Sequence, residues 1–296
     1  MIDIALLTEK RYLRTSSNDW YIRNIIKEDS LVQNELEKLN ISCKRVAWDG
    51  HFIPSDFKFA LFRTTWNYFD EIDNFMIFLN TCKNNISLIN SHDLILWNLD
   101  KQYLLSLKDQ GVNIPETHIV NKKTEVSLQE IVDEHGWGDI VIKPCVSAAA
   151  WNTHYVKYNN IKSVEILFSD LTKSHDMMVQ SFQKNITSRG EVSFMIIGGS
   201  FSHAVLKMAK KGDFRVQDDF GGTVSMYVPE KREIDFALYA VSKLPSKPAY
   251  ARVDVIVDNN DNLALSELEL IEPEMWFRLK PESARCLARY IRCNLV

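Results

Sequence analysis

Alternating apolar and polar positions over residues 250–275 predict an antiparallel hairpin. The polar run 258–262 is a turn signal between its two strands. Glu267 and Glu269 lie two positions apart in the second strand, so both carboxylates point to one face, where Asp254 of the first strand can join them. The second strand is flanked by apolar residues, which indicates a packed strand: Leu263, Leu265, Leu268, Leu270 and Ile271.

Three carboxylates on one sheet face repel one another and need a cation. Ligands that are all oxygen suit a hard ion such as Mg²⁺, which usually also binds phosphate oxygens. The alternative is an edge hairpin with a solvated acidic face. The packed flanks favour the metal site, with Asp254, Glu267 and Glu269 as ligands.

The N-terminal pattern predicts a small parallel α/β lobe. An apolar run at 2–8 and strand-like runs at 43–48 and 57–62 surround a helical pattern at 19–39. Ligands of such lobes gather at the carboxyl ends of the strands. The third strand ends in a group of polar and aromatic residues, Arg63, Trp66, Asn67 and Tyr68, and we expect this group to contact substrate. The alternative is that these residues form a helix cap with core aromatics.

The middle of the chain alternates helical and strand patterns. Residues 91–110 predict one helix that carries Lys101, and the strand 139–144 ends at Lys143 before a loop of small residues that includes Ser147. A lysine that closes an apolar strand is either a solvated surface group or a contact for an anion. Small neighbouring side chains let backbone N–H groups approach phosphate closely, so they favour the anion contact.

Before the hairpin, the pattern predicts strands at 177–182, 192–197 and 202–207 and a helix at 231–244. A closing helix is predicted after the hairpin, at 281–291. The glycine-punctuated segment 210–223, which carries Arg215, predicts a mobile loop able to fold over a ligand.

Composition excludes several classes of protein. A net charge of −4 gives no support for a nucleic-acid or anionic-membrane surface, and no apolar run is long enough to cross a bilayer. The first residues lack the basic region of a signal peptide. Five scattered cysteines without CxxC spacing fit reduced thiols and argue against zinc, so we expect a cytoplasmic protein.

Basic residues together with a carboxylate-held cation are what triphosphate binding and phosphoryl transfer require. The sequence has neither a P-loop GxxxxGK[ST] nor the kinase motifs. Nine motifs follow one another in the chain: NLDKQYLL, GVNIPET, DIVIKP, MVQSF, RGEVSF, HAVLK, GDFRVQDDFGG, RVDV and SELELIEPE. In this order they resemble the motifs of the ATP-grasp ligases. The resemblance is nearest to the glutathione-synthetase, ribosomal-protein-glutamate-ligase and cycloserine-forming cyclo-ligase groups.

The resemblance implies an ATP-grasp fold of three lobes, at 1–92, 93–178 and 179–296, the first Rossmann-like and the other two clamping ATP. It implies a ligase that uses ATP and two Mg²⁺ ions, with Mn²⁺ as an alternative, to activate a carboxylate as an acyl phosphate and form an amide-type bond. A small molecule or peptide would be the substrate, with no nucleic-acid or membrane partner, and a homodimer fits the family. A phosphotransferase and a non-catalytic nucleotide-binding protein are the alternatives.

The resemblance also implies roles for individual residues. Nucleotide contacts would come from Lys101, Lys143, Ser147, Gln180, Phe182 and Glu191. Catalytic charges would come from Lys207, Arg215 and Arg252. Two departures stand out: the phosphate loop holds alanines instead of glycines, and Glu269 stands where the family often has asparagine.

Overall fold

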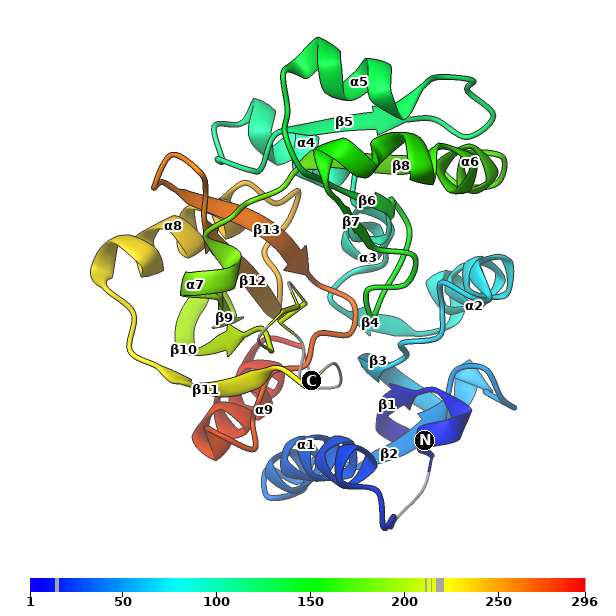
Figure 1. The fold of residues 1–296 in the computed structure, drawn as a ribbon. Coiled ribbons are helices and arrows are strands. Elements are labelled where there is room, and N and C mark those ends of the chain that lie inside the picture. Colours follow the sequence, from blue (N-terminus) through cyan, green and yellow to red (C-terminus); the bar gives the residue numbers. More distant parts are fainter. Residues whose placement is uncertain (14–15, 211, 214, 217–220, 296) are drawn as a thin grey trace.

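The computed structural model describes residues 1–13, 16–210, 212–213, 215–216 and 221–295. Its strands form three sheets, which confirms the mixed α/β class (Figure 1). Among the described residues, no helix is both long and apolar enough to cross a membrane.

The N-terminal sheet is parallel, as predicted, in the order β2-β1-β3-β4. Alternate residues of β1 face opposite sides, so Ile4 and Leu6 pack with α1 while Ala5 and Leu7 pack with α2. The elements of this part are β1 (Ile2–Thr8), α1 (Trp20–Glu37), β2 (Cys43–Ala47), β3 (Phe57–Thr64), α2 (Ile72–Asn85) and β4 (Ser87–Ile89).

The central sheet is antiparallel, in the order β5-β8-β6-β7, and α5 and α6 pack on it. The pattern did not predict its short strand β7. The elements of this part are α3 (His92–Leu99), α4 (Tyr103–Asp109), β5 (Thr117–Val120), α5 (Leu128–His135), β6 (Ile140–Pro144), β7 (His154–Val156), α6 (Ile161–Thr172) and β8 (Met177–Ser181).

The single helix predicted over 91–110 is wrong, because the chain leaves the helical conformation at Asp100. The Asp100 carboxylate accepts a hydrogen bond from the backbone N–H of Gln102 at 2.8 Å, a local bond that competes with the helical pattern. The backbone N–H of Lys101 instead bonds the carbonyl of Cys145, 2.9 Å away. The break therefore ties Lys101 to the segment that follows β6.

The C-terminal sheet is antiparallel, in the order β11-β10-β9-β12-β13. The predicted hairpin is its last two strands, with Asp254 opposite Glu267 and Arg252 opposite Glu269. Neither α7 nor the edge strand β11 was predicted. The elements are α7 (Ile186–Arg189), β9 (Glu191–Ile197), β10 (Ser200–Met208), β11 (Thr223–Tyr227), α8 (Lys231–Ser242), β12 (Tyr250–Val257), β13 (Leu263–Glu269) and α9 (Pro281–Asn294).

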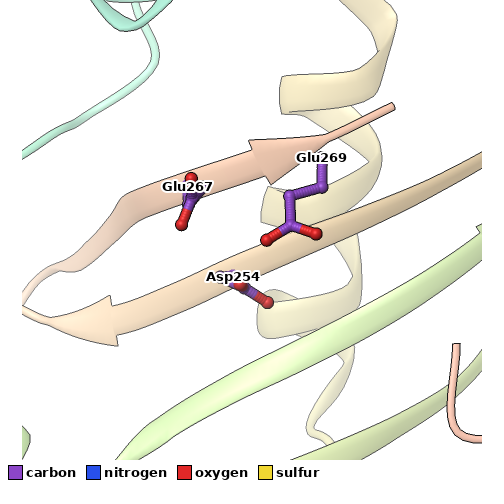
Figure 2. Close-up of side chains that lie close together, drawn as sticks. All are labelled: Asp254, Glu267 and Glu269. Atoms are coloured by element: carbon purple, nitrogen blue, oxygen red, sulfur yellow. The ribbon is translucent and has the colours of Figure 1, made fainter. Parts of the chain in front are cut away.

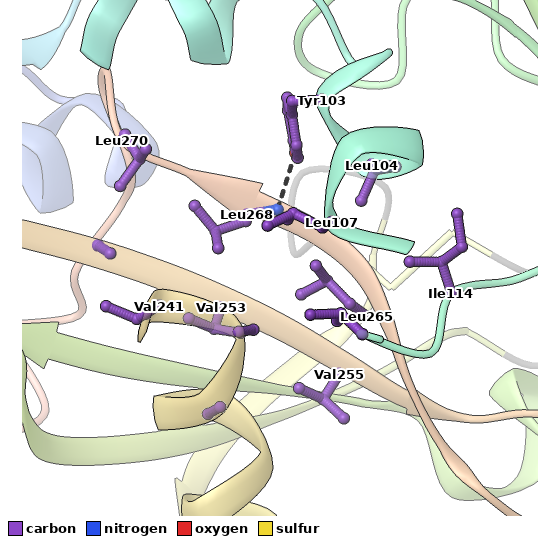
Figure 3. Packing of buried hydrophobic residues seen from close by; sticks show 14 of the residues in the cluster. Tyr103, Leu104, Leu107, Ile114, Val241, Val253, Val255, Leu265, Leu268 and Leu270 are labelled. Atoms are coloured by element: carbon purple, nitrogen blue, oxygen red, sulfur yellow. Dashed lines mark hydrogen bonds between the residues drawn. The ribbon is translucent and has the colours of Figure 1, made fainter. Parts of the chain in front are cut away.

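The outer side of β13 is packed, as its apolar flanks predicted. Leu265, Leu268 and Leu270 are fully buried in a cluster with residues of α4, α8 and β12 (Figure 3). Tyr103 accepts a hydrogen bond from the backbone N–H of Leu268 at 2.8 Å. Asn98 donates to the carbonyl of Leu268 and accepts from the N–H of Leu270, both at 2.7 Å. Side chains from α3 and α4 thus take the place of a sixth strand and fix the strand that carries the glutamates.

Candidate active site

A cavity of about 280 Å³ is lined by residues of the central and C-terminal sheets, together with residues of α1 and of the segment that follows β3. All of the predicted site residues except Arg63 and Asn67 line it. The lining residues among the predictions are Trp66, Tyr68, Lys101, Lys143, Ser147, Gln180, Phe182, Glu191, Lys207, Arg215, Arg252, Asp254, Glu267 and Glu269.

The three predicted metal ligands come together in this cavity (Figure 2). Asp254, Glu267 and Glu269 each offer a carboxylate oxygen, and these atoms all lie within 4.8 Å of one another. Burial raises the pKa of Glu269 to about 7. Burial also acts to raise the pKa of Asp254, but the charges of Arg252 and Lys207 outweigh it and hold that pKa at about 2. An oxygen-only donor set with this charge fits a hard divalent cation.

Two basic side chains, Arg252 and Lys207, bind these carboxylates. Arg252 donates from Nε and Nη2 to Asp254, at 3.0 Å to Oδ1 and 2.9 Å to Oδ2, and also bonds Glu269. The Nζ of Lys207 lies 3.3 Å from Asp254 and also pairs with Glu191. Burial acts to lower the pKa of Lys207, but these two carboxylates raise it above its usual value.

The two predicted phosphate lysines also line the cavity. Lys101 Nζ lies 3.2 Å from Glu267 Oε1 and donates to the carbonyl of Ser147. Burial lowers the pKa of Lys143, against the opposing charge of Glu267. A lysine whose charge is disfavoured in this way gains from any anion that reaches it.

The small-residue loop after β6 has an unusual backbone. Ala149 and Ala150 are consecutive residues in the left-handed region, with φ of +50° and +54°. Both line the cavity. Alanine therefore adopts here a backbone conformation for which glycine is the usual choice, so the loop keeps a glycine-like backbone although it holds alanines.

The predicted nucleotide slot involves β8 and β9. Gln180 donates to the Thr117 hydroxyl at 2.9 Å, and the Phe182 ring lies 4.4 Å from that of Tyr155. Glu191 accepts from Ser266 at 2.6 Å. The structure places these side chains in the cavity, while their contacts with ATP stay a prediction.

The predicted lid is described only in part, because residues 211, 214 and 217–220 lie outside the described residues. Arg215 reaches the cavity and forms an ion pair with Asp213, with Nη2 and Oδ2 2.8 Å apart. Thr223, the last residue of the predicted loop, already belongs to β11.

Two predicted substrate contacts do not line the cavity. Arg63 is 2% exposed, and its Nε lies 3.3 Å from Asp29, so its carboxylate partner belongs to the protein. Asn67 accepts from the Trp48 indole at 2.8 Å and donates to Asp49 at 2.9 Å. Both residues bond to other parts of the protein at the end of the N-terminal sheet, and their contact with substrate stays a prediction.

The cavity also contains residues that no local pattern had singled out. Tyr21 from α1 and Trp276 from the segment after β13 join Trp66 and Tyr68 in an aromatic wall. Glu272 is 6% exposed and also lines the cavity. These contacts join segments far apart in the chain.

The fold and the site define a class. The family model described as "Prokaryotic glutathione synthetase, ATP-grasp domain" matches residues 101–273, more than half of the chain. The chain therefore belongs to the ATP-grasp family and is an ADP-forming ligase. A second model, "D-cycloserine synthetase DcsG, N-terminal domain", matches residues 4–90.

Individual relatives narrow the comparison. The cycloserine biosynthesis protein DcsG of Streptomyces lavendulae is 22% identical over 245 residues, which cover 77% of this chain and 80% of the relative. The crystal structure of D-cycloserine synthetase DcsG matches with a TM-score of 0.88 at 19% identity and covers 99% of both chains. D-alanine–D-alanine ligase from Bacillus anthracis matches with a TM-score of 0.72 at 15% identity, covering 99% of this chain and 96% of the ligase. At these identities the structural matches show the shared fold.

Proposed function

We propose that this ligase activates the carboxylate, or a similar acyl group, of a small amino-acid-derived molecule as an acyl phosphate and then closes an amide-type bond. The observation that carries the proposal is the convergence of five basic side chains and the acidic trio Asp254, Glu267 and Glu269 in one cavity. Similarity to DcsG in both the N-terminal lobe and the ATP-grasp part supports an amino-acid-like substrate and a place in natural-product biosynthesis.

The residues divide this work by position. Lys101 and Lys143 would bind the ATP phosphates, and the acidic trio would hold two Mg²⁺ ions, for which Mn²⁺ is a substitute. Magnesium, when bound, neutralises phosphate charge during phosphoryl transfer. Arg252, Lys207 and Arg215 would stabilise negative charge on the transferred phosphoryl group and the acyl phosphate.

The aromatic side chains of the cavity are the candidates for contact with the acyl substrate. The aromatic wall of Tyr21, Trp66, Tyr68 and Trp276 would contact the acyl substrate, and acyl phosphates hydrolyse readily, so closure against water is needed. Similarity to DcsG favours a small molecule over a peptide as the substrate.

The experiment is an ADP-release screen over amino acids, short peptides, and ureido and hydroxamate acids, with mass spectrometry of the products. We expect Mg²⁺-dependent ADP release with a carboxylic acid and a product that has lost water relative to its precursors. ADP with a phosphorylated product identifies a phosphotransferase instead. No ADP release with any acid contradicts the proposal and leaves a nucleotide-binding protein without turnover.

A further inference from the structure

Trp276 is a cavity residue to which neither the metal site nor the nucleotide slot assigns a task. It is 3% exposed, lines the cavity and has a φ of +46°, a conformation that is costly for a large side chain. Its carbonyl accepts from Leu279 N–H at 2.9 Å, and the next residue, Phe277, donates its N–H to Glu28 at 2.9 Å. The surrounding contacts therefore hold Trp276 in a conformation that its own backbone disfavours.

The face of the Trp276 ring lies beside both cations that bind the acidic trio. Arg252 Cζ is 5.3 Å from the ring centroid, and Lys207 Nζ is 5.7 Å from it. Both distances are within the range of a cation–π interaction. The ring therefore restricts where these two charges sit relative to Asp254, which both of them bind.

The edge of the same ring carries an unused donor. The indole N–H of Trp276 is buried and has no hydrogen-bond partner among the residues that the structure describes. Buried donors are nearly always paired, because an unpaired one loses its hydration without compensation. The indole N–H can donate but not accept, so its partner must be an acceptor atom.

We propose that Trp276 acts twice in the acyl activation put forward above, on which this inference rests: its ring face positions Arg252 and Lys207, and its indole N–H donates a hydrogen bond to a carboxylate or carbonyl oxygen of the acyl substrate. The side chain is thus a substrate contact and also a positioning residue for the two cations. The ligand it selects is an oxygen acceptor.

Two substitutions separate these tasks. Trp276→Phe keeps an aromatic face and removes the N–H, so the KM of the acid rises about tenfold or more while kcat and the KM of ATP hold. Trp276→Leu removes the face as well, and kcat then falls too. Trp137→Phe is the matched control. The buried indole N–H of Trp137 donates to Glu116 at a distance of 2.8 Å, and Trp137 does not line the cavity. An unchanged KM of the acid in Trp276→Phe overturns the donor role, and an unchanged kcat in Trp276→Leu overturns the positioning role.

A second readout needs no turnover. In protein with ¹⁵N-labelled indoles and bound MgADP, the Trp276 N–H signal is assigned by its loss in Trp276→Phe. Acetate, the simplest carboxylate probe, shifts this signal more than sodium chloride of equal ionic strength does. No acetate-specific shift in MgADP-bound protein overturns the donor role. If acetate shifts the signal but the protein releases no ADP with any acid, the donor role of Trp276 is retained and the proposed ligation is refuted.

Discussion

Asn98→Ala tests how the strand of the two glutamates is held in place. Asn98 is 7% exposed, and its amide makes two hydrogen bonds of 2.7 Å, one to Leu268 in β13 and one to Leu270, which directly follows this strand. The substitution leaves one buried carbonyl and one buried N–H of these two residues with a lost partner. At roughly 1–3 kcal/mol for each group, partly relieved by relaxation, we expect a loss of about 2–4 kcal/mol in the free energy of unfolding.

The measurement is urea unfolding in EDTA, followed by an Mg²⁺ titration of the folded variant. Tyr103→Phe removes the partner of one N–H and costs less, about 1–2 kcal/mol. Asn80→Ala, at an exposed helix position, is the control and stays within about 0.5 kcal/mol of the parent. We also expect weaker Mg²⁺ binding in Asn98→Ala, because Glu267 precedes the freed segment and Glu269 lies within it. A stability equal to that of the control would refute the account of how β13 is anchored.

Two further substitutions address single charged groups. Lys143→Met raises the KM of ATP about 10- to 100-fold by removing a charged phosphate contact, without lowering the melting temperature, because burial disfavours the lysine charge; an unchanged KM would contradict the phosphate role. Burial lowers the pKa of His203 from 6.5 to about 4. Between pH 6.5 and pH 4 the unfolded chain therefore binds more protons than the folded protein does. The contribution of neutral His203 to the free energy of unfolding is thus fully present above about pH 6.5 and is lost as the pH falls toward 4. His203→Gln should reduce the stability lost between pH 7 and pH 4 by at most about 3 kcal/mol in pH-dependent urea unfolding, and a pH dependence equal to the parent's would refute this.

The sequence predicted best what local spacing determines. Period-two alternation placed Glu267 and Glu269 on one face, and antiparallel pairing brought Asp254 opposite Glu267. The parallel N-terminal sheet followed from apolar runs separated by a helical pattern. The assignments of individual residues to ATP, metal ions and catalysis, and the three lobe boundaries, stay predictions.

Side-chain competition and long-range contacts could not be predicted from spacing. The helix through Lys101 breaks because the Asp100 carboxylate bonds a nearby backbone N–H, which apolar periodicity does not register. Arg63 stands at a strand end where ligands gather, yet Asp29, from a helix 34 residues earlier, binds it first. Trp276 follows the last strand and reaches the cavity with its own backbone in the left-handed conformation, which local sequence does not indicate for tryptophan.

Magnesium dependence of ADP release in Glu267→Gln tests whether the acidic trio holds the metal ions that acyl activation needs. The substitution keeps the shape of the side chain and removes one charge from the acidic trio, and exposed Glu134→Gln is the control. ADP release is measured over an Mg²⁺ titration with saturating acid. We predict at least about a 100-fold loss that added Mg²⁺ restores only in part, with parent activity in the control. Turnover of Glu267→Gln at the parent rate and the parent Mg²⁺ dependence would contradict the metal site and the acyl activation built on it.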